Sequence, residues 1–340
     1  MGVNDEPLIT VLTPVYNGEP FLRDCIESVI AQTYKNFEYI IVNNCSSDRS
    51  LDIALSYSKQ DPRIQVRSNK EFVDIIENHN TAFRLVSPSA KYCKVVSADD
   101  GLFPDCITRL VETAEAYPSA GFVGCYQISG NRIRWQGFPY PKALLNGREL
   151  CRQMLLNNDS SYGLADDRSF GFGAPTSLLY RADLVRRTAT FFPNASPHAD
   201  TSACYANLKD CDFAFVYQVL CWERLHAATQ STQSFEINDL SYADLNDIMQ
   251  YARFYLSSQE YEQKLQQSLN DYYEFMAINI IARRGRTFWD YHKGKFEELG
   301  YPMKTSAVLK AVMVRGFREI VNPAQAIRKI RRRFAGSMRR

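Results

Sequence analysis

Short apolar segments alternate with amphipathic segments along the chain up to Tyr126. Between the apolar segments, hydrophobic positions recur at helical spacing in residues 21–30 and 75–86, and another helix is expected after Pro104. This order predicts an α/β fold, with a mainly parallel sheet and helices on both of its faces. The apolar, β-branched runs that are typical of buried parallel strands occupy residues 8–13, 37–42, 64–67, 92–97 and 121–126.

The pattern is less regular beyond Tyr126. Gly130-Asn131 predicts a hairpin within residues 128–135. From Asp239 onward the signals are helical. We therefore expect an α/β core in residues 1–230 and a helical region in residues 231–340. Within the core, residues 147–156 favour a helix, and residues 176–180 and 212–216 favour strands.

Two adjacent carboxylates, Asp99 and Asp100, follow the strand predicted at residues 92–97. Ligands of open α/β sheets bind at the carboxyl ends of strands. Neighbouring acids repel each other, and a divalent cation relieves that repulsion. The pair therefore predicts a metal site that could hold a diphosphate. The alternative is that these acids cap the helix that follows Pro104.

Composition narrows the class of protein. Hydrophobic residues make up 45% of the chain and aromatic residues 13%, which excludes a wholly disordered protein. The nine cysteines form no CxxC pair, which favours free thiols in a reducing compartment. Residues 1–7 lack the features of a signal peptide, and no apolar stretch approaches the roughly 20 residues of a membrane span. These features indicate a cytoplasmic protein, or one bound to the cytosolic face of a membrane.

Charge is distributed unevenly. Residues 304–340 contain eleven basic residues and one acid, a charge of +10 in a chain of net charge +2, so the remainder carries −8. Apolar residues recur among these basic ones at helical spacing from Phe317 to Phe334. A basic amphipathic helix predicts binding to an anionic membrane surface. Packing against the core is the alternative; nucleic acid is the least supported partner, because no stacking aromatics accompany the charge.

Several segments together resemble the family-2 inverting glycosyltransferases of the GT-A fold. The resemblance covers roughly residues 8–230, and its motifs stand in the order that this family shows. They are TVLTPVYNG at 10–18, IIVNNCSSD at 40–48, ENHNTA at 77–82, SADD at 97–100, GAPTS at 173–177, HAD at 198–200 and RLH at 224–226.

The resemblance implies a nucleotide site and favours a UDP-sugar donor. The family usually has Asp where this chain has Asn43 and Asn44. An amide both donates and accepts hydrogen bonds, so the base stays open, and the two residues could instead only form a turn. The implied donor contacts come from Pro14, Val15, Tyr16, Asn17, Asn43, Asn44 and Asn80, with Asp99 at the ribose.

The family pattern also implies a cation and a diphosphate site. Asp99 and Asp100 would bind Mn²⁺ or Mg²⁺, although Ser97 replaces the acid that usually precedes them. His226 would join the metal, and Arg224 with His226 would face the leaving diphosphate. An exposed surface pair is the alternative for Arg224 and His226.

Asp200 stands where the family places its catalytic base, which takes the proton from the acceptor hydroxyl. Ala199 replaces the usual Glu before it, and His198 is a rival base. A helix cap is the other interpretation of Asp200.

The implied activity is metal-dependent, inverting transfer of a sugar to a hydroxyl group of a glycan or lipid-linked glycan during surface glycan assembly. A sugar-1-phosphate nucleotidyltransferase is one alternative, although residues 14–18 lack the basic Gly-rich loop expected of it. A non-catalytic nucleotide- or carbohydrate-binding subunit is another, which the substitutions at Asn43, Asn44, Ser97 and Ala199 keep open.

Overall fold

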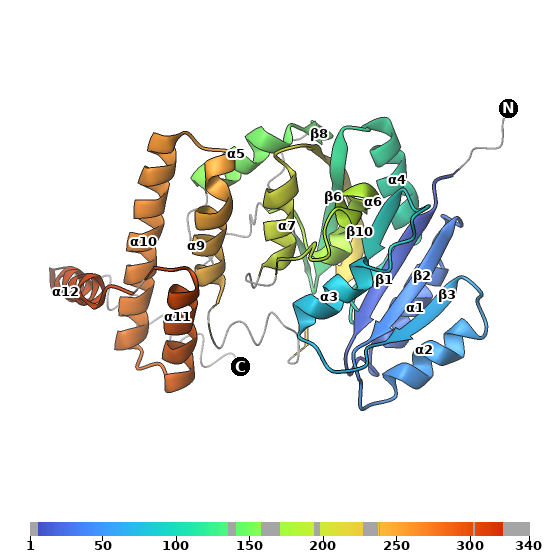
Figure 1. Cartoon of the computed structure of the whole chain (residues 1–340), viewed down its shortest axis with the longest axis horizontal. Helices are drawn as coiled ribbons and strands as arrows, with labels where there is room; N and C mark the ends of the chain where they lie inside the picture. The colour runs from blue at the N-terminus through green and yellow to red at the C-terminus, as the bar shows by residue number, and fades with distance from the viewer. Residues whose placement is uncertain are drawn as a thin grey trace. The chain divides into compact units, whose positions relative to one another are not determined.

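The computed structural model describes residues 6–134, 141–157, 171–193, 198–226, 237, 239–301 and 303–321. Its internal contacts divide the chain into two units. One consists of Met1–Thr229 with Gln250–Leu256, and the other of Gln230–Met249 with Ser257–Arg340 (Figure 1).

A single sheet forms the centre of the first unit, in the order β3-β2-β1-β4-β9-β6-β10-β5. β1 pairs in parallel with β2 and β4, β2 with β3, and β6 with β10, whereas β9 is antiparallel to both of its neighbours. The predicted, mainly parallel α/β fold is thus confirmed. The strands of this path are β1 (Ile9–Val15), β2 (Phe37–Asn43), β3 (Ile64–Ser68), β4 (Tyr92–Val95), β5 (Gly101–Leu102), β6 (Ala120–Ser129), β9 (Leu178–Arg181) and β10 (Asp212–Glu223).

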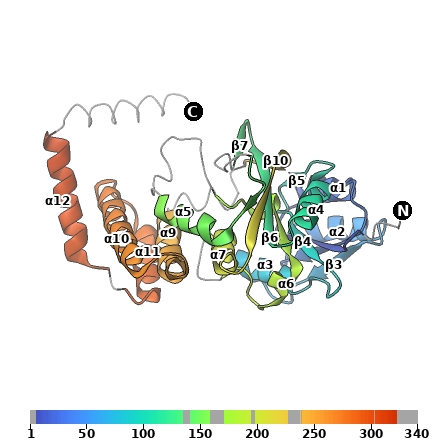
Figure 2. The same cartoon turned by 90° about the horizontal axis from the view of Figure 1, so that it is seen from above.

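Helices cover both faces of the sheet, as the alternating pattern predicts (Figure 2). β1 is buried at all seven positions, as a central parallel strand should be. One face shares a core with α1 (Leu22–Ile30), α2 (Ser50–Ser58) and α4 (Cys106–Ala116). On α3 (Ile75–Phe83), the Phe83 ring packs edge-on against Tyr180 of β9. The other described helices of this unit are α5 (Gly147–Asn157), η1 (Pro175–Ser177), α6 (Ala182–Arg186), α7 (Ala199–Asn207) and η2 (Ala252–Phe254).

The hairpin predicted at Gly130-Asn131 is confirmed. β6 continues through it into β7 (Arg132–Arg134), with Ser129 paired to Arg132. Gly130 has a φ of +60°, which glycine adopts without strain. A further short strand, β8 (Leu144–Leu145), pairs with β10.

The chain after the two acids forms a short strand before the predicted helix. Gly101 and Leu102 form β5 and pair with Trp222 and Cys221 of β10. This close approach requires glycine, because a Cβ at position 101 would lie 2.2 Å from the Trp222 ring. α4 begins at Cys106, so the helix predicted after Pro104 is confirmed.

The described part of the second unit is helical, as predicted. Its helices are α9 (Leu240–Tyr251), α10 (Ser258–Ile281), α11 (Arg286–Glu298) and α12 (Thr305–Val321). Tyr272, Met276 and Phe296 lie in their shared core, and Ser257 with Glu260 forms a capping box at the start of α10. Among the described helices, none is long and apolar enough to cross a membrane. The predicted tail beyond Val321 lies outside the described residues.

Candidate active site

The loops that follow β1 and β2 are joined to each other at the carboxyl edge of the sheet. Asn17 has a φ of +50°, an arrangement that Asn tolerates. Its backbone N–H donates to Ser46 Oγ (3.0 Å), and its side-chain oxygen accepts from the Ser47 N–H (2.8 Å). Asp48 accepts from the Glu19 N–H at 2.9 Å. These hydrogen bonds hold the two loops against each other.

The predicted nucleotide contacts in the loop after β1 differ in which of their atoms a ligand could reach. Pro14 and Val15 are buried within β1, so a ligand could reach only their main chain. The Val15 carbonyl already accepts the Asn44 N–H at 2.8 Å. Tyr16, by contrast, is 52% exposed and ready to meet a ligand.

Asn43 and Asn44 are buried rather than presented to solvent. Asn44 forms hydrogen bonds within the protein through both its Oδ1 and its Nδ2, and Asn43 Oδ1 lies 3.3 Å from the Ser46 N–H. The turn-forming role, which the sequence left open, fits both residues.

Asn80 is also fully buried. Its Nδ2 donates to the Phe192 carbonyl (2.8 Å), and its Oδ1 accepts the Phe192 N–H (2.9 Å). In this structure Asn80 thus supports the segment that precedes α7, and its contact with a nucleotide stays a prediction. The sequence could not show this role, because the two residues are 112 positions apart.

Asp99 and Asp100 lie side by side after β4 but in different surroundings. The Asp99 side chain is 32% exposed, whereas Asp100 is buried and accepts the Thr176 hydroxyl at 2.7 Å. Burial, with the neighbouring Asp99 carboxylate, raises the pKa of Asp100 to about 8. Neither acid caps α4, whose N-cap is Asp105.

A buried lysine lies behind this pair. Lys94 of β4 is fully buried, and its ammonium group donates to the carbonyls of Thr176 and, at 3.0 Å, Leu178. The Ser97 N–H donates to Thr176 Oγ1 at 3.1 Å. Thr176 is thus held from both sides where it contacts Asp100. The GAPTS motif marked this segment in the sequence, but not its role.

His226 and Asp99 meet in the structure although they lie 127 positions apart. His226 Nε2 is 3.0 Å from Asp99 Oδ2, and the imidazole packs on Phe21 with ring centroids 4.4 Å apart. Adjacent ligands of an octahedral cation, each about 2.1 Å from the metal, are about 3 Å from each other. The pair therefore fits two neighbouring positions on Mg²⁺ or Mn²⁺. No cluster of three or more such ligands occurs among the described residues.

Arg224 is also at this site, but its guanidinium is engaged. It pairs with Asp24 of α1 at 2.7 Å and lies over the rings of Phe21 and Trp222. Its backbone N–H, 3.4 Å from Asp100 Oδ1, faces the acids. A diphosphate contact would require the side chain to leave Asp24, so that role stays a prediction.

Asp200 lies in the first turn of α7, one residue beyond the helix start, while His198 is the N-cap residue. Burial raises the pKa of Asp200 to about 6, and burial lowers the pKa of His198 to about 4. A base is most effective when its pKa lies near the working pH, which favours Asp200 over His198. Asp200 also accepts the Thr201 N–H at 2.8 Å, so it satisfies one donor of the first turn.

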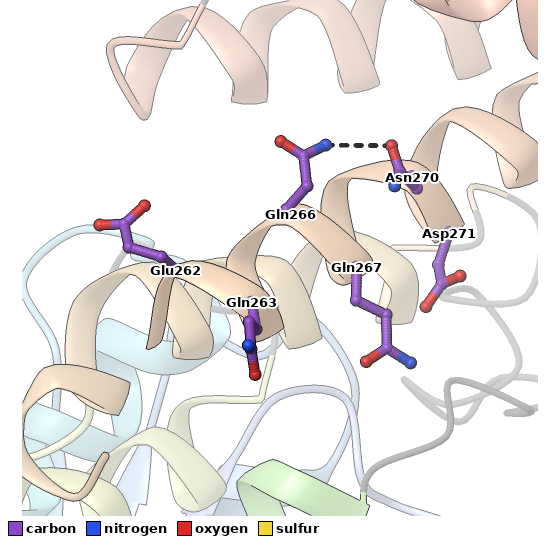
Figure 3. Close-up of a pocket in the computed structure, with 6 residues that line it drawn as sticks. All are labelled: Glu262, Gln263, Gln266, Gln267, Asn270 and Asp271. Atoms are coloured by element: carbon purple, nitrogen blue, oxygen red, sulfur yellow. Dashed lines mark hydrogen bonds between the residues drawn. The ribbon is translucent and has the colours of Figure 1, made fainter. Parts of the chain in front are cut away.

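A hollow of about 620 Å³ lies along α10 in the second unit (Figure 3). All its lining residues come from this one helix and are exposed. It holds none of the predicted site residues. Its lining is Glu262, Gln263, Gln266, Gln267, Asn270 and Asp271.

Several glycosyltransferases are similar to this chain in sequence. The glycosyltransferase GlyA of Streptococcus pneumoniae is 37% identical over 126 residues, and EpsJ of Bacillus subtilis, an uncharacterised glycosyltransferase, is 35% identical over 128. The aligned part is 37% of this chain in both cases, but only 17% of GlyA and 36% of EpsJ. An uncharacterised glycosyltransferase of Haemophilus influenzae is 27% identical over 244 residues, covering 68% of this chain and 70% of the relative.

Solved structures show the same fold. TarS 1–349 of S. aureus in complex with UDP-GlcNAc has a TM-score of 0.60 at 14% identity and covers 86% of this chain and 80% of its own. The mannosyltransferase PcManGT of Pyrobaculum calidifontis, in complex with GDP-Man and Mn²⁺, has a TM-score of 0.50 at 13% identity, with coverages of 92% and 88%. Residues 10–187, a little over half of the 340, match the family described as glycosyl transferase family 2, and the chain therefore belongs to that family.

Proposed function

We propose that this glycosyltransferase moves a sugar from a nucleoside diphosphate sugar to a hydroxyl group of a glycan or lipid-linked glycan, with inversion at the anomeric carbon. The observation that carries the proposal is the Asp99–His226 pair at the carboxyl edge of the sheet. It offers two adjacent cation ligands and leaves the remaining positions to phosphate and water. TuaG of Bacillus subtilis, putatively named for teichuronic acid biosynthesis, is 33% identical over 109 residues and supports an acceptor of this class.

Asp99 and His226 would hold Mn²⁺ or Mg²⁺. The bound cation would supply positive charge to the diphosphate and make it a better leaving group. Asp100 is too buried for open exchange with solvent, and its bond to Thr176 holds it behind Asp99. We assign it the role of fixing the acidic loop.

Asp200 would accept the proton of the acceptor hydroxyl as the oxygen attacks the anomeric carbon. The bond to the diphosphate breaks on the opposite face in the same displacement, so an α-linked donor gives a β-linked product. An alcohol is a weak nucleophile until its proton leaves, which is why the mechanism needs a base.

Donor turnover tests the proposal. The full chain is incubated with Mn²⁺ and, in turn, UDP-GlcNAc, UDP-glucose and GDP-mannose, and the release of nucleoside diphosphate is measured. We expect release from at least one donor and its loss in excess EDTA. Release of pyrophosphate from a nucleoside triphosphate and a sugar 1-phosphate would favour the nucleotidyltransferase instead. A retained α-linkage in the product, seen by NMR, would contradict inversion.

The pH dependence should report the ionisation of Asp200. A carboxylate must be ionised to accept a proton, so kcat/KM should fall on the acid side with a midpoint near the pKa of about 6. Because this pKa is raised above the ordinary 3.8, its stabilising contribution is full below pH 3.8 and is lost as pH rises through about 6. The active, ionised form is thus the less stable one. The measurement is a pH–rate profile at saturating Mn²⁺. If Asp200→Asn shows the same fall in kcat/KM on the acid side, that fall reports the ionisation of another group.

A membrane-surface role is proposed for α12 and the basic residues 304–340. Leu309, Met313 and Phe317 are exposed at spacings of four residues, so they form one apolar stripe on α12. The charge of +10 in this segment complements anionic lipid headgroups, each basic residue near such a surface adding roughly 1 kcal/mol.

Flotation with vesicles tests this role. We expect the full chain to float with phosphatidylserine vesicles at low salt, less at high salt, and not with neutral vesicles. Replacing Leu309, Met313 and Phe317 together by Ser should abolish flotation without changing donor hydrolysis. Equal recovery with neutral and anionic vesicles would contradict the electrostatic part of the proposal.

A further inference from the structure

A lysine is buried behind the acidic loop, residues 97–100, and is held there by neutral groups. Lys94 of β4 is fully buried, and its ammonium group donates to the carbonyls of Thr176 and, at 3.0 Å, Leu178. The Val95 carbonyl, 3.4 Å away, is a third acceptor. Lys94 forms no ion pair within the part of the chain that the structure describes. Lysine is almost never fully buried unless it is paired, so this placement indicates a specific role.

The carbonyls that Lys94 binds belong to the step from η1 into β9. Thr176 lies in η1 and Leu178 begins β9, which is the antiparallel neighbour of β4. Because Lys94 is opposite Leu179 in this pairing, η1 lies at the carboxyl end of β4. An ammonium group has three N–H donors and no acceptor, so it can serve three carbonyls at once. Lys94 therefore fastens η1 to the end of the strand that leads into the acidic loop.

Thr176 in turn holds both ends of the acidic loop. It is fully buried, and its hydroxyl accepts the Ser97 N–H at 3.1 Å and donates to Asp100 Oδ2 at 2.7 Å. The Asp100 N–H donates to the Ser97 carbonyl at 3.0 Å, so residues 97–100 form a closed turn. Asp99, whose Oδ2 lies 3.0 Å from His226 Nε2, is part of this turn. One buried hydroxyl thus connects the segment that Lys94 fastens to the turn that carries Asp99.

We propose that Lys94 and Thr176 are positioning residues for the cation of the active site. Lys94 fixes η1, Thr176 fixes the turn, and the turn holds the Asp99 carboxylate beside His226; neither positioning residue touches the cation. This inference rests on the proposed cation site at Asp99 and His226. A ligand that is already held in place loses little conformational freedom when the cation binds, and this preorganisation raises the affinity.

Binding of Mn²⁺ to the full chain without nucleotide tests the inference. The dissociation constant is measured from the electron paramagnetic resonance signal of free Mn²⁺, together with the melting temperature. Thr176→Val keeps the shape of the side chain and removes only its hydroxyl from Ser97 and Asp100. We expect the dissociation constant to rise by about 10- to 100-fold, the range for loss of a group that orients a metal ligand. Thr176→Ser keeps a hydroxyl and should bind Mn²⁺ almost as tightly as the wild-type enzyme.

Thr10→Val is the matched control for this substitution. Thr10 is equally buried, in β1, but its hydroxyl donates to Glu38 and not to the acidic loop. Thr10→Val should therefore lower the melting temperature about as much as Thr176→Val does, while Mn²⁺ affinity stays at the wild-type value. An equal loss of Mn²⁺ affinity in the two variants would trace the effect to general destabilisation and would overturn the positioning role.

Lys94→Gln and Lys94→Met test the first step. The Gln amide can donate to two carbonyls and the Met side chain to none, so Mn²⁺ affinity should fall from the wild-type enzyme to Lys94→Gln and further to Lys94→Met. Lys94→Gln keeps the test available if Lys94→Met does not fold. In the Thr176→Val enzyme, Lys94→Gln should add little further loss, because Lys94 acts through Thr176. An additive loss would overturn this order of action.

The same measurements separate this inference from the proposed function. A wild-type enzyme that binds no Mn²⁺ would contradict the cation site itself. Mn²⁺ binding that is lost in Asp99→Asn but unchanged in Thr176→Val would leave the cation site in place and overturn the positioning role alone.

Discussion

Asp200→Asn should lower kcat by about 10²- to 10⁴-fold, which is the range for loss of a positioned general base. The amide has nearly the shape of the carboxylate, so it can still accept the Thr201 N–H that Asp200 accepts at 2.8 Å. It cannot take a proton from an alcohol. We therefore expect the dissociation constant for the nucleotide donor and the melting temperature to change little, while turnover is nearly lost.

Two variants make this prediction specific. Asp210→Asn changes an exposed carboxylate just beyond the end of α7 and should keep wild-type turnover. His198→Gln replaces the rival base, whose pKa is lowered by burial to about 4. This substitution should lower turnover far less than Asp200→Asn does. Wild-type turnover in Asp200→Asn, or a larger loss in His198→Gln, would exclude Asp200 as the base.

The strands of the sheet could be predicted because their signal is local. Residues 37–42 are nearly all apolar or β-branched, and a segment of this kind between two helical patterns can satisfy its backbone only within a sheet. The pairing order could be expected only in outline. β9 is inserted antiparallel between β4 and β6, although it comes much later in the chain. Its place depends on contacts such as that of Lys94 with Leu178, which no local pattern encodes.

The candidate site was predictable to a similar degree. Asp99 and Asp100 could be found from their place after a strand, and His226 from its motif. What each acid does depends on distant groups, since Thr176 buries and binds Asp100 while Asp99 stays open to His226.

Asp99→Asn should lower kcat/KM by about 10²- to 10³-fold at a fixed Mn²⁺ concentration, a loss typical of removing one element of charge stabilisation in an active site. The Asn side chain keeps an oxygen for the His226 ring, whose Nε2 lies 3.0 Å from Asp99 Oδ2. The local structure should therefore persist, while the negative charge that attracts the cation is lost. Calorimetry should show weaker Mn²⁺ binding, and higher Mn²⁺ should recover part of the activity.

Coupling between the two ligands gives the sharper test. Suppose that Asp99 and His226 share one cation. His226→Gln should then lower kcat/KM much less in the Asp99→Asn enzyme than in the wild-type enzyme, because Asp99→Asn already weakens binding of the same ion. Asp105→Asn, which alters an exposed acid before α4, is the matched control and should leave Mn²⁺ binding unchanged. Additive losses at the two positions would mean that each side chain acts separately. In that case His226 would orient Asp99 or contact the diphosphate rather than bind metal.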